Sequence, residues 1–190
     1  MQIPHGADYH YLNKNTMKSI LLFCCLGLCS IVACKKDNGK RDYWGEVSVL
    51  KNGELWNSKI IALQHTFSKE KVDITIKKST EEDINIDNLL LFKIPKASGR
   101  YKLSYSINQP PDDSLVGARY FNTYEDVLYD VYDLAENDST SYLEITEYND
   151  RKDEFRGKFH LTLYRTLKGS INVPDTLIFT EGTFHTRIDD

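Results

Sequence analysis

The strongest local signal of structure in this chain lies in residues 46–60, which read EVSVLKNGELWNSKI. Asn52 and Gly53 stand between two runs that carry apolar residues. Asn-Gly favours a two-residue hairpin turn, because both central positions of that turn need a positive φ. Counted outward from the turn, the two strands pair as far as Glu46 and Lys59, whose opposite charges suit a cross-strand pair. This register predicts an apolar face made of Val47, Val49, Trp56 and Ile60.

The same alternation of apolar and polar residues recurs along the rest of the chain. Further strands are expected at residues 72–77, 89–94, 101–105, 142–148, 155–165 and 175–184. Turn-forming residues separate them at roughly ten-residue intervals, and we find no long amphipathic helix in the sequence. The pattern predicts an all-β fold, namely a single antiparallel β-sandwich or β-barrel-like domain after a cleaved signal peptide.

Two segments are harder to read. Residues 79–88 read STEEDINIDN, in which six of the ten side chains are acidic or amide, and they are interpreted as a loop or one helical turn. Residues 118–134 are rich in tyrosine and acid, and their tyrosines favour strands over a helix.

A glycine precedes an aromatic residue by two positions at three places, Gly99-x-Tyr101, Gly157-x-Phe159 and Gly182-x-Phe184. Each pair lies near the start of an expected strand. A glycine inside a strand indicates a bulge or a close approach of another group, so we expect these glycines beside aromatic rings.

Residues 17–37 read MKSILLFCCLGLCSIVACKKD, with one basic residue, an apolar stretch and a small residue before a cysteine. This is the layout of a secretory signal. The alternative is a membrane-spanning helix, but the apolar stretch of residues 20–33 would rise only roughly 21 Å, against a hydrocarbon core of ~30 Å. We expect a signal peptide at 17–33, and we interpret residues 1–16 as an upstream translation-start artefact.

The sequence Ile31-Val32-Ala33-Cys34 resembles the lipobox of bacterial lipoproteins. The resemblance implies that Cys34 is acylated and becomes the first residue of the mature chain. Lys35-Lys36-Asp37 is weakly similar to the charged start of some Bacteroidetes lipoproteins that reach the cell surface. Several acyl chains would make the membrane anchor effectively permanent. We therefore expect a lipidated tether at 34–42, a β-rich domain at 43–190, and an outer-membrane location, on the surface or the periplasmic face.

Three short motifs of the mature part also resemble small uncharacterised Bacteroidetes lipoprotein families. They are NGELW at 52–56, GRY at 99–101 and EGTF at 181–184. These families have no assigned activity, so the resemblance implies no functional residue.

Composition narrows the possible partners. The chain has 24 basic and 28 acidic residues, and removal of Lys14, Lys18 and Asp8 with residues 1–33 leaves 22 basic and 27 acidic residues. A mildly acidic, mixed surface argues against nucleic acid as a partner. All four cysteines lie at or before Cys34, so a mature domain of 157 residues would fold as one domain without a disulfide.

The densest aromatic cluster of the chain is formed by Tyr120, Phe121, Tyr124, Tyr129 and Tyr132. Such side chains anchor protein partners or stack on sugar rings. Half of any strand faces inward, so core packing is the alternative interpretation. We keep Tyr120, Tyr124, Tyr129 and Tyr132 as candidate partner-binding residues.

Other chemistry finds little support in the sequence. Asp126 and Asp130 could serve a carboxylate-dependent hydrolase and, with Asp133, could bind calcium, but no calcium-loop spacing is present. His65, His160 and His185 lack the spacing of a zinc site, and His65 is interpreted as a satisfied histidine on a strand face with Leu63 and Phe67. We predict no catalytic, metal or cofactor residue.

These observations favour a membrane-anchored lipoprotein whose non-catalytic β domain binds a partner protein or a glycan. The alternatives are the carboxylate-dependent hydrolase and a purely structural component of the envelope.

Overall fold

A computed structural model describes residues 43–79, 84–104, 115–135 and 138–189 of the chain. By its contacts the chain divides into a unit Met1–Arg41 and a unit Asp42–Asp190, and the description concerns the second. The expected artefact at 1–16, the signal peptide, Cys34 and the tether at 34–42 lie outside the described residues. Among those described, no helix is long and apolar enough to cross a bilayer.

All named elements are strands, which confirms the predicted all-β class. They are β1 (Gly45–Lys51), β2 (Glu54–Leu55), β3 (Lys59–Gln64), β4 (Lys71–Ser79), β5 (Asn85–Pro95), β6 (Gly99–Lys102), β7 (Gly117–Tyr124), β8 (Val127–Leu134), β9 (Tyr142–Asn149), β10 (Glu154–Lys168) and β11 (Thr176–Asp189).

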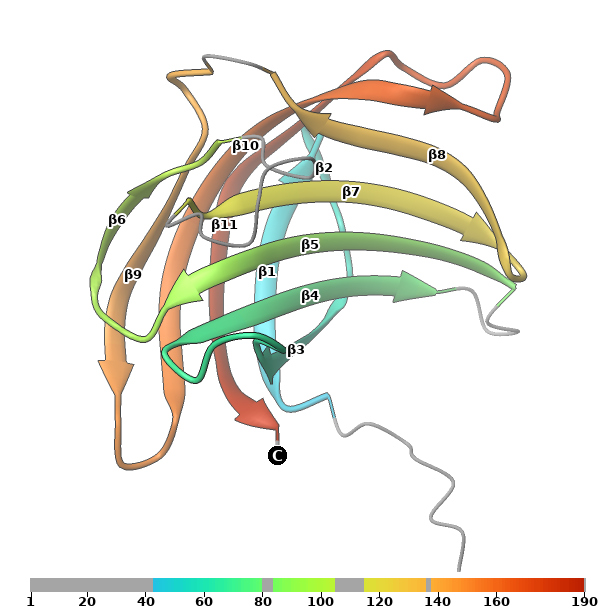
Figure 1. The fold of residues 1–190 in the computed structure, drawn as a ribbon. Helices are drawn as coiled ribbons and strands as arrows, with labels where there is room; N and C mark the ends of the chain where they lie inside the picture. The colour runs from blue at the N-terminus through green and yellow to red at the C-terminus, as the bar shows by residue number, and fades with distance from the viewer. Residues whose placement is uncertain (1–42, 80–83, 105–114, 136–137, 190) are drawn as a thin grey trace, which may run out of the picture. The chain divides into compact units, whose positions relative to one another are not determined.

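The strand pairings close into a ring. β3, β4, β5, β7, β8 and β10 follow one another by pairing, β10 pairs with β11, and β11 returns to β3. β1 and β2 extend the sheet from β11, while β9 and β6 extend it from β10. In Figure 1, β4, β5, β7 and β8 cross β1, β10 and β11 at a steep angle, as in the packing of two nearly orthogonal layers.

Among the named strands, the expectation of an antiparallel sheet fails for one pair, because Ile188 and Asp189 of β11 pair in parallel with Ala62 and Leu63 of β3. An isolated bridge between Leu103 and Val116 is also parallel. β1 runs antiparallel to β11, and the hairpin turn reverses the chain into β2. Residues 56–58 carry the chain on into β3 without a paired hairpin turn. β3 therefore runs in the same direction as β11.

The two longest strands join the layers. β10 pairs with β9 over Glu154–His160 and with β8 over Leu163–Lys168, so it belongs to both layers along its length. Its inward positions alternate through Phe155, Gly157, Phe159, Leu161 and Leu163, all of them buried. Val72, Ile74 and Ile76 of β4 do the same from the opposite layer. The predicted alternation of these strands is confirmed, and it encloses one continuous apolar core.

The predicted hairpin at 46–60 is confirmed at its tip, but the predicted pairing is wrong at its base. Asn52 and Gly53 have φ values of 52° and 83°, and Lys51 pairs with Glu54. β2 is only two residues long, however, so Glu46 pairs with His185 of β11 rather than with Lys59. The predicted apolar face survives, because Val49, Trp56 and Ile60 are buried and Val47 packs against the core.

The loop expected at 79–88 ends earlier than predicted. β5 already begins at Asn85, and its polar first half pairs with β4 on one side and with β7 on the other. Tyrosine-rich residues 118–134 form the β7–β8 hairpin, as their strand propensity indicated, with Glu125 at a φ of 51° in the turn.

Candidate ligand pocket

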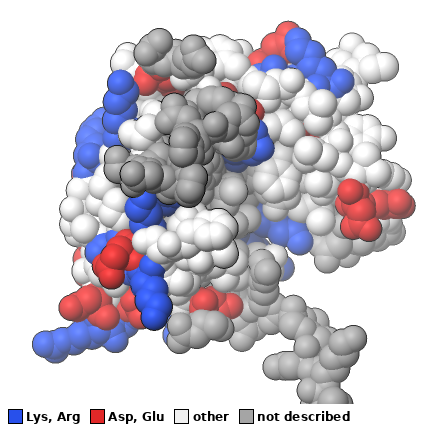
Figure 2. Space-filling view, in the orientation of Figure 1, with Lys and Arg blue, Asp and Glu red and all other residues white. Residues whose placement is uncertain are grey.

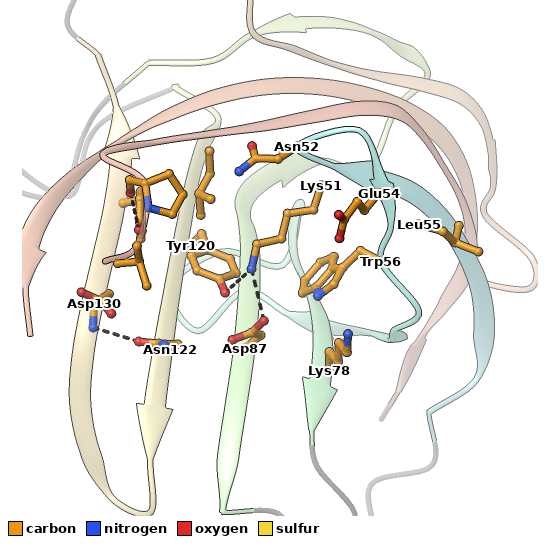
Figure 3. Close-up of a pocket in the computed structure, with 14 residues that line it drawn as sticks. Lys51, Asn52, Glu54, Leu55, Trp56, Lys78, Asp87, Tyr120, Asn122 and Asp130 are labelled. Atoms are coloured by element: carbon orange, nitrogen blue, oxygen red, sulfur yellow. Dashed lines mark hydrogen bonds and ion pairs between the residues drawn. The ribbon is translucent and has the colours of Figure 1, made fainter. Parts of the chain in front are cut away.

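A pocket of about 450 Å³ opens where the β1–β2 hairpin lies over the layer formed by β4, β5, β7 and β8 (Figure 3). The hairpin contributes Lys51, Asn52, Glu54 and Leu55, and Trp56 follows it. The remaining lining residues are Lys78, Asp87, Tyr120, Asn122, Asp130, Tyr132, Val173, Pro174 and Leu177. The wall therefore combines aromatic rings with both signs of charge.

Lys51 lies at the centre of this pocket. Its ammonium donates hydrogen bonds to Asp87 Oδ2 at 3.2 Å and to the Tyr120 hydroxyl oxygen at 2.6 Å. The same nitrogen lies 4.2 Å from the centre of the Tyr120 ring and 5.7 Å from that of Trp56, within cation–π distance. Burial lowers the pKa of Lys51, although the charge and hydrogen bond of Asp87 oppose this shift.

The turn next to Lys51 is fixed to the neighbouring strand. The Asn52 amide nitrogen of the backbone donates to the carbonyl of Ile178 at 2.8 Å, and the backbone N–H of Ile178 donates to Asn52 Oδ1 at 2.8 Å. This reciprocal pair ties the hairpin tip to β11. The position from which Lys51 reaches into the pocket is thus set by the backbone and side chain of Asn52 rather than by the lysine itself.

Aromatic rings form the inner part of the pocket. Trp56 packs edge-on against Tyr120 and Phe179, with ring centres 6.2 and 5.6 Å apart. Tyr120 packs edge-on against Tyr132 at 5.6 Å. Burial, followed by the charge of Asp87, raises the pKa of Tyr120, so its hydroxyl stays protonated. The indole Nε1 of Trp56 is buried, and no described residue accepts its hydrogen bond.

Asp130 anchors the opposite wall. Its carboxylate accepts hydrogen bonds from Arg165 Nε at 2.9 Å and Arg165 Nη2, from the backbone N–H of Gly169 and Ser170, and from the Ser170 hydroxyl. Burial alone would raise the pKa of Asp130, but the hydrogen bonds from Ser170 and Arg165 outweigh it and hold the pKa below its usual value. These contacts hold the β10–β11 connection against the pocket, where the Tyr132 hydroxyl donates to the carbonyl of Pro174 at 2.7 Å.

The predicted aromatic cluster divides between two places. Tyr120 and Tyr132 are buried and line the pocket, and Phe121 is half-buried. Tyr124 and Tyr129 are exposed on the β7–β8 hairpin, with ring centres 6.2 Å apart. Distance from the turn explains this division, because the residues next to Glu125 at the tip of the hairpin are exposed, whereas the far end of β8 is buried.

The three candidate carboxylates do not form one site. Asp126 is exposed in the β7–β8 turn, Asp130 is bound by Arg165, and Asp133 accepts two hydrogen bonds from Arg119 at 2.6 and 3.0 Å. No group of three or more His, Cys, Asp or Glu side chains is placed to hold a metal ion within the described ranges.

The histidines lie apart from the pocket. His65 Nδ1 is 2.9 Å from Asp73, as expected of a satisfied histidine, although Phe67 beside it is exposed rather than packed inward. His160 stacks on Tyr142, and His185 lies against Trp44 with Glu154 at 3.5 Å.

The sequence did not identify Lys51, Trp56 and Asp87 as site residues. Lys51 precedes a turn, where a lysine is usually solvated, and Asp87 was assigned to a loop. The signal that could have found Asp87 is its place opposite Lys78 in the β4–β5 pairing, which requires the correct start of β5.

Charged side chains elsewhere are mixed in sign. On the face drawn in Figure 2, lysine and arginine alternate with aspartate and glutamate between broad uncharged areas. No protein family, curated protein or solved structure matches this chain.

Proposed function

We propose that this chain is an outer-membrane lipoprotein, anchored by lipid on Cys34, whose β domain binds a glycan in the pocket around Lys51 without catalysing a reaction. The anchor rests on the lipobox-like sequence that ends at Cys34. The ligand class rests on the lining of the pocket.

The observation that carries the proposal is the combination of Trp56 and Tyr120 with Lys51 and Asp87 in one open pocket. A sugar presents hydroxyl groups at its edge and C–H groups on its faces, so it needs hydrogen-bonding and aromatic side chains together. A volume of about 450 Å³ lies within the usual range of ligand pockets, ~300–1,000 Å³. Lys51 and Asp87 already hold each other in place, which lowers the entropy cost of ordering them for a ligand.

The hydrolase alternative gains no support from its candidate residues. A glycosidase needs two free carboxyl groups on either side of the scissile bond. Asp130 is buried and bound by Arg165, while Asp126 is exposed in a turn. Binding is therefore favoured over hydrolysis.

A partner protein is the second candidate ligand, and it would bind a different surface of this chain. Tyr124, Val127, Leu128 and Tyr129 are all exposed at the tip of the β7–β8 hairpin. Exposed apolar side chains gathered in this way are typical of protein interaction sites.

The two candidates can be separated with the full-length protein purified from membranes in detergent and applied to a glycan array. We expect selective glycan binding that Lys51→Met weakens about tenfold or more, because the charged hydrogen-bond donor at the pocket centre is lost. The double variant Tyr124→Ala, Tyr129→Ala serves as the matched control and should bind as the wild type does.

Loss of glycan binding in the tyrosine variant alone would move the site to the β7–β8 tip. Absence of any glycan binding would overturn the proposal and leave the partner protein or the structural role.

A further inference from the structure

We propose that the glycan is acidic, and that its anionic group is held between the indole N–H of Trp56 and the ammonium of Lys78. This inference rests on the proposed function, since it names the ligand class of the same pocket.

The first step concerns the donor that has no acceptor. Trp56 is 3% exposed, lines the pocket, and its Nε1 finds no hydrogen-bond partner among the described residues. An indole N–H can only donate, so a ligand atom that satisfies it must be an acceptor. A buried donor without an acceptor is destabilising, and a ligand oxygen placed there removes that cost.

The second step concerns the balance of charge beside Trp56. Asp87 pairs with Lys78 across β4 and β5, so both side chains leave the sheet on the same side, and the same Asp87 also binds Lys51. The single carboxylate of Asp87 is thus set against two lysines, of which Lys51 is the one bound to it. Lys78 acts on Lys51 strongly enough to help burial lower the pKa of Lys51.

The other acids of the pocket do not cancel this excess. Asp130 is neutralised by Arg165 on the far wall. Glu54 is exposed on the short strand β2, and in Figure 3 Glu54 and Lys78 are drawn on opposite sides of the Trp56 ring. Lys78 itself is exposed, so its ammonium is accessible to a ligand.

The third step concerns the shape of the anion. The ammonium of Lys51 has three N–H bonds, and two of them already bind Asp87 and Tyr120. The donors left for a ligand are the ammonium of Lys78 and the indole N–H of Trp56. Both lie at the same end of the pocket, as Figure 3 shows for the indole nitrogen. A sugar carboxylate or sulfate ester offers several acceptor oxygens to such donors, whereas a neutral hydroxyl offers one oxygen without charge.

The test is isothermal titration of the full-length protein in detergent with three probes. They are an oligosaccharide of hexuronic acid, the same oligosaccharide after reduction of its carboxyl groups to alcohols, and a sulfated neutral oligosaccharide. We expect an anionic probe to bind at least tenfold more tightly than the reduced one, and this difference to shrink as salt is added.

Two variants locate the anionic group. Lys78→Met removes an exposed charge, and Trp56→Phe removes the N–H but keeps an aromatic ring. Each should weaken the acidic probe about tenfold. Lys78→Met should leave the reduced probe unchanged, whereas Trp56→Phe should weaken the reduced probe less than the acidic one, since it alters a ring that contacts either sugar. Lys158→Met is the matched control, because Lys158 is also an exposed strand lysine but does not line the pocket. A thermal melt checks whether Trp56→Phe is folded. If Trp56→Phe unfolds, Lys78→Met alone tests where the anionic group binds.

The outcomes separate this inference from the proposed function. Equal affinity for the hexuronic and reduced probes, without binding of the sulfated one, would overturn the inference and leave glycan binding intact. Tight binding of the sulfated probe alone supports the inference with sulfate as the anion. Failure of all three probes together with failure on the glycan array would overturn the proposed function itself.

Discussion

At the scale of single residues, Asp130 shows how a buried charge organises a wall of the pocket. Both of its oxygens are used by donors from β10 and from the connection that follows. Removing one partner of a buried ion pair leaves the other charge uncompensated, which is far more costly than losing a surface pair.

Asp130→Asn should therefore lower the free energy of unfolding by about 3–5 kcal/mol, measured by denaturant titration. Asp175→Asn is the control, because Asp175 also faces Arg165 but is exposed, and its midpoint of unfolding should not change. A wild-type midpoint in Asp130→Asn would contradict the role given to the pair.

The same residue sets a dependence on pH. The folded-state pKa of Asp130 lies below its unfolded value of 3.8, so its carboxylate contributes stability that is fully present above pH 3.8. That contribution is lost as the pH falls through the folded-state pKa. We expect the wild type to lose stability on acidification below about pH 4, and Asp130→Asn to lose less over the same range, as followed by circular dichroism. Parallel losses in both proteins would contradict the assignment.

At the scale of elements, β10 and β11 each place a glycine opposite an aromatic ring of the other strand. Gly157 pairs with Phe184 and Gly182 pairs with Phe159, so each ring lies over the glycine of the other strand. A methyl group on Gly182 would come within 2.7 Å of the Phe159 ring. The glycine–aromatic spacing in the sequence predicted this kind of close approach, and the pairing confirms it.

Gly182→Ala should destabilise the fold by about 1–3 kcal/mol through overpacking. Adding Phe159→Leu should recover part of that loss, because the smaller side chain makes room for the methyl group. A thermal melt measures both, with Thr183→Ala as an exposed neighbour that should change stability by less than about 1 kcal/mol. A simple sum of the two single effects in the double variant would contradict direct contact.

Local patterns predicted most of the strands but not all of their partners. Alternation found β4, β9 and β10, since one side of each faces the core. The partner of β1 was missed, because Glu46 pairs with His185 of β11 and nothing near Glu46 in the sequence indicates so distant a contact. The start of β5 was missed because its side chains are largely polar, and Asp87 among them lines the pocket instead of the apolar core.

The candidate site was predicted only in part for the same reason. Tyr120 and Tyr132 were chosen as aromatics in a dense cluster, and they do line the pocket. Lys51 and Asp87 meet across 36 positions of the chain, and such a pair becomes visible only when the ring of strands is closed.

At the scale of the whole molecule, the proposed anchor makes a separate prediction. Cys34→Ser should abolish labelling by radioactive palmitate and leave a precursor of higher mass, because serine lacks the sulfur that carries the lipid. Cys29→Ser is the matched control, since Cys29 lies within the expected signal peptide and its loss should leave labelling intact. Palmitate on the Cys34→Ser protein would show that the lipid is attached elsewhere.

The pairing of β1 with β11 also limits how early the fold can form during synthesis. The hydroxyl of Thr186 donates to the carbonyl of Trp44, which lies 142 positions earlier in the chain. At a synthesis rate of ~5–20 residues per second, about 7 to 28 s separate the two ends of that contact on the ribosome. Throughout that interval β1 has no β11 to pair with, so the ring of strands cannot close before β11 has been synthesised. If the chain is exported as we propose, it would still lack this contact while its first half enters the translocation channel.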